Sequence, residues 1–181
     1  MVANGASTEH AQPFPSPMES MFCELALLHR IWLIPGSMFE RDGDRIYNTL
    51  SVINPQGEVV CRYRKMFPFR PYEQGVEGGS EFGVFDVPAV GRFGVSICYD
   101  MWFPETTRTL ASMGAEVILH PTMTDTVDRD IELSIARTNA AINQCYFFDF
   151  NGTGAMGNGR SIVVGPSGDV IHQCGVGEEI V

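Results

Sequence analysis

The sequence lacks the features that would place the protein in a membrane, on nucleic acid or outside the cell. No run approaches the roughly 18 consecutive apolar residues of a membrane-spanning helix. There are 12 Lys and Arg against 22 Asp and Glu, and a net charge of −10 would repel a phosphate backbone. The first residues have neither the basic start nor the apolar run of a signal peptide. We therefore expect a cytoplasmic protein with no membrane and no nucleic-acid partner.

The sequence also lacks clustered cysteines and histidines. Its five cysteines are dispersed without any CxxC, and its four histidines add no Cys/His spacing typical of zinc. An odd, scattered set of cysteines without an export signal indicates reduced thiols. We therefore expect no metal ion. One of these reduced thiols can act as a reactive group, and the composition does not identify which one. The cysteines are Cys23, Cys61, Cys98, Cys145 and Cys174.

The one glycine-rich motif does not indicate a dinucleotide site. Residues 152–157 match GxGxxG, but they lead into the strand-like segment 161–165 and not into a helix. Without a helix N-terminus the pyrophosphate has no binding site. We expect no cofactor.

The length and composition that are present fit one globular domain. The chain has 181 residues, of which 44% are apolar and 19% charged, and this excludes disorder. Residues 1–15 are small and polar and predict a loose lead-in to a domain over residues 16–181. Strand-like and helix-like segments are mixed along the domain, which predicts an α/β, or layered α+β, fold. The predicted strands cover residues 31–34, 46–54, 58–65, 82–87, 91–98, 116–120, 145–150, 161–165 and 169–173, and helices start near residues 16, 104 and 131.

The first helix has a complete start signal. Ser16 can cap the helix, Pro17 fits its first position, and Glu19 stands where a capping box places its acid.

Cys98 is the strongest candidate for chemistry. It ends the apolar strand predicted over residues 91–98, and a helix begins six residues later at Pro104. A sharp strand-to-helix turn projects a side chain toward a cleft beside backbone N–H groups that can bind an oxyanion. The alternative is that Cys98 is a small buried hydrophobic residue, as free cysteines often are.

Lys65 continues the more apolar row of the strand predicted over residues 58–65. Alternation places Tyr63 and Lys65 on one face, and Arg62 and Arg64 on a face that we expect to be solvated. A lysine on an inward-facing row either extends its ammonium to water at the end of the sheet or takes part in a functional site.

Five short segments then stand in a recognisable order. They are Tyr47-Asn48-Thr49, Tyr63-Arg64-Lys65, Ile97-Cys98-Tyr99-Asp100, Phe103-Pro104-Glu105 with Arg108, and Gly114-Ala115-Glu116-Val117-Ile118-Leu119. Their order and spacing resemble the nitrilase, or carbon–nitrogen hydrolase, superfamily from about residue 13 to the last. The resemblance implies a four-layer α-β-β-α sandwich that forms a homo-oligomer.

The resemblance also implies hydrolysis of a non-peptide C–N bond. Cys98 would attack the carbonyl carbon and form a thioester, which water would then hydrolyse. Lys65 and the backbone N–H of Tyr99 would stabilise the oxyanion. The additional acidic residue of the superfamily best matches Glu73.

Residues close to the nucleophile suggest a branch and a substrate class. The sequence Cys98-Tyr99-Asp100 stands where nitrile hydrolysers usually have Cys-Trp-Glu, and it resembles the amidase and carbamoylase branches. The implied substrate is a small molecule with an amide or N-carbamoyl group.

The next residues would shape the cleft. Tyr99, Trp102 and Phe103 would give it aromatic walls, and Glu105 and Arg108 would brace the turn beneath the nucleophile.

Relative to the superfamily, the chain is expected to be truncated at both ends. The general-base Glu of the superfamily comes after an opening strand, but residues 1–15 contain only Glu9, whose surroundings do not resemble that motif. We expect the first strand to be missing and the chain alone to be a weak enzyme, since loss of a general base costs about 10²–10⁴-fold. The alternative is a non-catalytic remnant that serves as a binding or assembly module.

Overall fold

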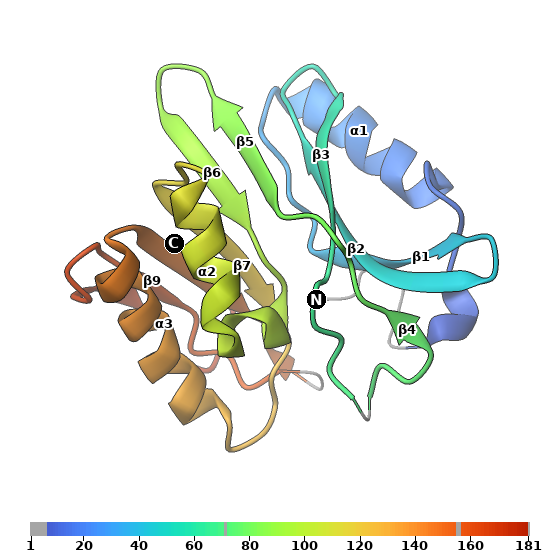
Figure 1. Cartoon of the computed structure of the whole chain (residues 1–181). Helices are drawn as coiled ribbons and strands as arrows, with labels where there is room; N and C mark the ends of the chain where they lie inside the picture. Colours follow the sequence, from blue (N-terminus) through green and yellow to red (C-terminus); the bar gives the residue numbers. More distant parts are fainter. Residues whose placement is uncertain (1–6, 71, 155–156, 181) are drawn as a thin grey trace. The chain divides into compact units, whose positions relative to one another are not determined.

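The structure is a computed structural model that describes residues 7–70, 72–154 and 157–180. Internal contacts divide the chain into an N-terminal unit, Val2–Glu81, and a C-terminal unit that includes Phe82–Val181. Each unit pairs one β-sheet with helices (Figure 1). The predicted mixed α/β class is confirmed. No helix within the described ranges is long and apolar enough to cross a membrane.

In its described residues, the N-terminal unit holds one α-helix and a sheet in the order β1-β2-β3, with β4 paired to β2. The first three strands are antiparallel, and β4 runs parallel to β2. Helix α1 packs on β2. The elements are η1 (Thr8–His10), α1 (Pro17–His29), β1 (Ser37–Asp42), β2 (Arg45–Ile53), β3 (Val59–Arg64) and β4 (Val76–Glu77).

The start of α1 confirms its cap and corrects its capping box. The Ser16 hydroxyl accepts a bond from the Glu19 N–H at 3.1 Å, as predicted. The Glu19 carboxylate, however, accepts from the Ser51 hydroxyl at 2.6 Å and from two nitrogens of Arg62 at 2.9 Å. Burial acts to raise the pKa of Glu19, but the bonds from Arg62 and Ser51 outweigh it and hold the pKa below its usual value. A guanidinium is a stronger partner for this carboxylate than a neutral backbone N–H.

The two arginines expected in solvent are also ion-paired. Arg62 binds Glu19, and Arg64 binds Glu40 at 2.6 Å and Asp42 at 2.9 Å, while their side chains stay 43% and 34% exposed. The face of β3 that carries them is therefore covered partly by carboxylates and not by water alone.

The strand predicted over residues 31–34 is wrong. Only Leu33 pairs there, in a single bridge with Ile53, and Ile31 is 44% exposed. The segment is confined between the left-handed helix cap at Arg30 and Pro35, which has no N–H to donate. The strand forms instead at β1, which the sequence did not predict.

The expected lead-in is bonded to β1 through Gln12. The Gln12 N–H donates to the Phe39 carbonyl at 3.1 Å, and the Arg41 N–H donates to the Gln12 carbonyl at 2.8 Å. The domain boundary at residue 15 stays a prediction.

The C-terminal unit contains a six-stranded sheet in the order β10-β9-β8-β7-β6-β5. Strands β6, β7 and β8 are parallel, and the outer pairings are antiparallel. Helices α2 and α3 pack on each other and on this sheet (Figure 1). The elements are β5 (Gly83–Val87), β6 (Gly91–Val95), η2 (Cys98–Trp102), α2 (Pro104–Ser112), β7 (Val117–Thr122), α3 (Arg129–Asn143), β8 (Tyr146–Asn151), β9 (Ile162–Val164) and β10 (Val170–Gln173).

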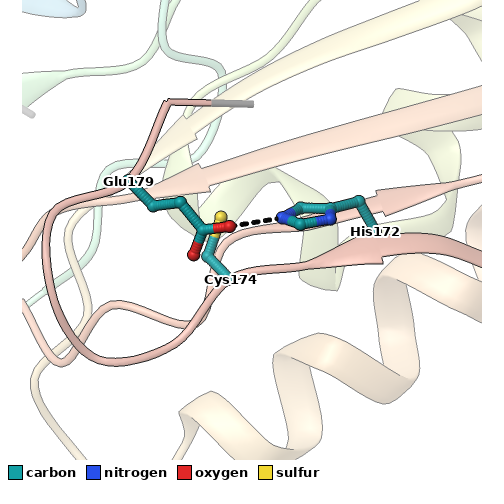
Figure 2. A group of neighbouring side chains, drawn as sticks. All are labelled: His172, Cys174 and Glu179. Atoms are coloured by element: carbon teal, nitrogen blue, oxygen red, sulfur yellow. Dashed lines mark hydrogen bonds and ion pairs between the residues drawn. The ribbon is translucent and has the colours of Figure 1, made fainter.

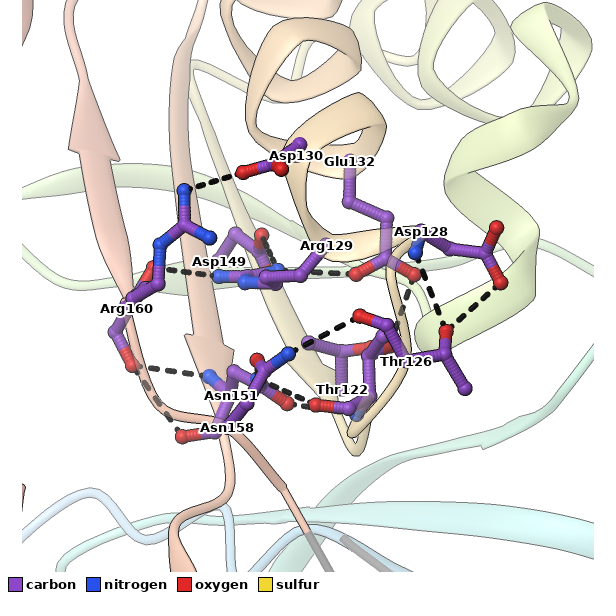
Figure 3. A network of polar contacts seen from close by, with 12 residues as sticks. Thr122, Thr126, Asp128, Arg129, Asp130, Glu132, Asp149, Asn151, Asn158 and Arg160 are labelled. Carbon is purple, nitrogen blue, oxygen red and sulfur yellow. Dashed lines mark hydrogen bonds and ion pairs between the residues drawn. The ribbon is translucent and has the colours of Figure 1, made fainter. Parts of the chain in front are cut away.

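A buried ionic network joins the start of α3 to β8 (Figure 3). Arg129 donates to Asp149 at 2.7 Å, to Glu132 at 3.2 Å and to the Arg160 carbonyl at 2.8 Å. Burial raises the pKa of Asp149 to about 7, although Arg129 opposes the rise. Because the side chains of Arg129, Glu132 and Asp149 are almost fully buried, each depends on its partners for the interactions that water would otherwise supply.

Candidate active site

Cys98 lies at a sharp turn between β6 and α2. It is the first residue of η2, and its φ of 48° lies in the left-handed region that side chains other than glycine rarely adopt. The Ile97 N–H donates to the fully buried Asp100 carboxylate at 2.9 Å, and the Asn139 amide donates to the Met101 carbonyl at 3.1 Å. These bonds hold the turn in its strained shape. Backbone strain maintained in this way is typical of functional sites.

The burial of Cys98 differs from that of an inert core thiol. Cys145 is such a core thiol, since it is 1% exposed and burial raises its pKa to about 11. Cys98 is only partly buried. Its position is that of an accessible thiol at a strand-to-helix turn.

Aromatic side chains gather around Tyr99. The ring of Phe103 lies edge-on at 5.2 Å, and the ring of Trp102 lies at 6.3 Å. All three are partly buried, and Trp102 also packs against the core of the unit. Their role as walls of a substrate cleft stays a prediction.

Lys65 is the only lysine in the sequence and is 2% exposed. It comes directly after β3, where its N–H donates to the Asn48 carbonyl at 2.7 Å. Its ammonium donates to Glu73 at 2.6 Å, so it does not extend to water as one of the two sequence interpretations proposed.

Glu73 links this group together. Its second oxygen accepts from the Asn48 amide at 2.7 Å, and the Phe69 N–H also donates to the carboxylate. The residue is 7% exposed, so Lys65 and Glu73 form a buried, hydrogen-bonded ion pair. Such a pair orients a buried ammonium, and loss of either partner would leave an uncompensated charge.

Asn48 also belongs to this buried group, although it entered the sequence analysis only as part of the Tyr47-Asn48-Thr49 segment and was given no role. It holds Glu73, and among the described residues its side-chain carbonyl oxygen has no hydrogen-bond partner although it is buried. The available signal was the polar Asn48 inside a buried strand segment.

Gly79 places Lys65 through a close backbone contact. Its N–H donates to the Lys65 carbonyl at 2.8 Å, and a Cβ added there would lie 2.2 Å from the Arg64 carbonyl oxygen. We expect Gly79→Ala to destabilise the protein by about 1–3 kcal/mol in urea unfolding, because the backbone of β3 must move. Gly177→Ala is the control, since a Cβ there meets nothing within 4 Å. Equal stability of the two variants would contradict the expectation.

The braces predicted beneath the nucleophile are wrong. Glu105 is exposed, and Arg108 donates to the Ile142 carbonyl at 3.3 Å. Both lie on the outer face of α2, because Thr106, Thr107 and Leu110 take the inner face. Asp100 and Asn139 brace the turn instead.

The predicted site residues thus fall into two groups. Lys65 and Glu73 are in contact within the N-terminal unit, and Cys98 stands with the three aromatic residues in the C-terminal unit.

The chain is similar to one family of known proteins. Residues 4–181 match the family described as carbon-nitrogen hydrolase. The human omega-amidase NIT2 is 29% identical over 96% of this chain and 68% of its own length. A deaminated glutathione amidase of Dictyostelium discoideum is 34% identical over 82% of this chain and 58% of its own length.

The fold is shared with solved structures of the same group. The crystal structure of Saccharomyces cerevisiae Nit3, a member of the nitrilase superfamily, matches 96% of this chain with a TM-score of 0.84 and 31% identity. The chain covers 69% of that structure. The predicted nitrilase-type fold is confirmed, and the chain spans about 58–69% of the length of these relatives.

Proposed function

Because the chain belongs to the carbon–nitrogen hydrolase family, we propose that it hydrolyses the amide bond of a small molecule through a thioester on Cys98. The observation that carries the proposal is the turn at Cys98, where a partly exposed thiol is held in a left-handed backbone conformation. Two relatives are named as amidases, which favours an amide over an N-carbamoyl substrate.

The proposed reaction has two steps. The Cys98 sulfur attacks the carbonyl carbon, the C–S bond forms, the C–N bond breaks, and the amine leaves with the proton of the thiol. Water then attacks the thioester, which releases the carboxylic acid and restores the thiol. Each step passes through a tetrahedral oxyanion that a positive charge stabilises.

Lys65 is the proposed source of that charge, together with the Tyr99 N–H. The buried contact with Glu73 supports this role, because it fixes the ammonium before substrate arrives. The joint action of Lys65 and Cys98 rests on the family resemblance.

A primary-amide assay tests the proposal through Glu73. We expect slow ammonia release from small amides by the wild-type chain, and a further loss of about 10²-fold in Glu73→Gln, because Lys65 loses the carboxylate that orients it. Glu77→Gln, at an exposed position of β4, is the control and should keep the wild-type rate. A wild-type rate in Glu73→Gln would overturn the role of the pair. Absence of ammonia release from every amide would favour the non-catalytic module.

The single lysine makes a direct readout possible. In protein labelled with ¹³C-lysine, the side-chain signal reports on Lys65 alone. We expect a saturable shift of this signal when an amide is added to the Cys98→Ser variant. An unchanged signal at a concentration that the wild type hydrolyses would exclude contact between Lys65 and the substrate.

A further inference from the structure

Three side chains of different chemistry, none of them used in the proposed reaction, converge at the end of β10. Figure 2 shows His172, Cys174 and Glu179, whose nitrogen, sulfur and carboxylate oxygen all lie within 4.8 Å of one another. The His172 Nε2 is 2.8 Å from a Glu179 oxygen.

The local backbone explains this convergence. His172 and Cys174 are two residues apart on an extended segment, so their side chains share one face. The Cys174 N–H continues the strand pairing by donating to the Ser161 carbonyl at 2.9 Å. The chain then turns back over residues 175–178, and the Gly175 N–H donates to Glu179 at 3.3 Å. The Glu179 carboxylate is therefore held in place by the first residue of the turn that precedes it.

In place of the sequence expectation of no metal, we propose that His172, Cys174 and Glu179 form a binding site for a zinc ion, with water as the fourth ligand. Imidazole nitrogen, thiolate sulfur and carboxylate oxygen are the three protein donors that zinc accepts, at bonds of about 2.0–2.3 Å. Tetrahedral bonds of that length separate the donor atoms by about 3.3–3.8 Å. The His172–Glu179 pair, at 2.8 Å, would have to open slightly, and any pair near the upper limit of 4.8 Å would have to close by about 1 Å. Both shifts are within reach of two partly exposed side chains.

The surroundings leave room for the fourth ligand. A cavity of about 210 Å³ borders Cys174 and Glu179 and is also lined by Asn151, Thr153 and Ser161. These polar side chains can hold a zinc-bound water. Calcium and magnesium take oxygen ligands almost exclusively, so a thiol and an imidazole disfavour them.

The charges facing the cluster suit a cation. The same cavity is lined by Glu178, which adds a carboxylate, and by Arg160. The Arg160 guanidinium is bound to Asp130 at 2.7 Å, which offsets its charge.

Zinc would bind Cys174 as the thiolate and release the thiol proton, as it does with thiol ligands generally.

Zinc titration of the reduced, chelator-treated 181-residue chain against a chromophoric chelator tests the site. We expect one zinc per chain and at least about tenfold weaker affinity in each of His172→Gln, Cys174→Ser and Glu179→Gln. Cys23→Ser, His29→Gln and Glu77→Gln are the matched controls and should bind as the wild type does. His172 and Glu179 are partly exposed, so their variants remain informative even if Cys174→Ser folds poorly.

Cobalt substitution gives a second readout that does not depend on activity. We expect a thiolate-to-cobalt charge-transfer band that disappears in Cys174→Ser and persists in Cys98→Ser. The proposal is overturned by substoichiometric binding, by unchanged affinity in the three variants, or by a band that survives Cys174→Ser.

Discussion

Replacing Cys98 by serine is expected to reduce ammonia release from a small amide by about 10³-fold or more. The proposed mechanism has no other nucleophile, and a serine hydroxyl is ionised far less than a thiol. The change replaces one sulfur atom by oxygen at a partly exposed position, and the bonds that hold the turn come from Asp100 and Asn139. Circular dichroism and unfolding should therefore match the wild type, which separates loss of chemistry from loss of fold.

Cys23→Ser is the control for this prediction. Cys23 is also partly buried but lies on α1, and burial raises the pKa of its thiol. Its replacement should leave the rate unchanged. Equal rates for wild type and Cys98→Ser would contradict the proposed role of Cys98.

Replacing Arg129 by methionine is expected to destabilise the protein by about 3–5 kcal/mol, measured by urea unfolding. Methionine preserves much of the length of the side chain but leaves Asp149 and Glu132 buried without their cation. It also leaves the Arg160 carbonyl without its donor.

A second ion pair provides the matched control. Arg92 and Asp86 bond at 2.8 Å on the surface, with side chains 43% and 66% exposed, so water compensates for loss of the arginine. Arg92→Met should therefore lower the free energy of unfolding much less than Arg129→Met does. The double variant Arg129→Met/Asp149→Asn should recover part of the lost stability, because one uncompensated carboxylate is removed. Equal losses of unfolding free energy in Arg92→Met and Arg129→Met would show that burial does not make the network more important for stability.

The sequence predicted the elements that depend on interactions between residues close together in the chain. Strands β2 and β3 were predicted from alternation and from the turn at residues 54–57, where the Gly57 N–H donates to the Asn54 carbonyl. Strand β1 was missed because its buried Glu40 does not look like a core residue. The partner that satisfies it, Arg64, lies 24 residues further along the chain.

The same distinction applies to the candidate site. The strand end predicted the location of Cys98, but not its left-handed backbone, which depends on bonds from Asp100 and Asn139. Alternation predicted that Lys65 points inward. It could not predict that Asn48 holds Glu73, since 25 residues separate them. The catalytic roles, the cytoplasmic location and the homo-oligomer remain predictions.

The central claim is a covalent acyl group on Cys98, and acid-quenched mass spectrometry tests it most directly. The chain is mixed with a small primary amide, quenched during turnover, digested and analysed peptide by peptide. The proposed mechanism predicts an acyl thioester on the peptide that contains Cys98, absent from Cys98→Ser and present in Cys23→Ser. Ammonia release that continues in Cys98→Ser, with no acyl group on the Cys98 peptide of the wild type, would contradict it.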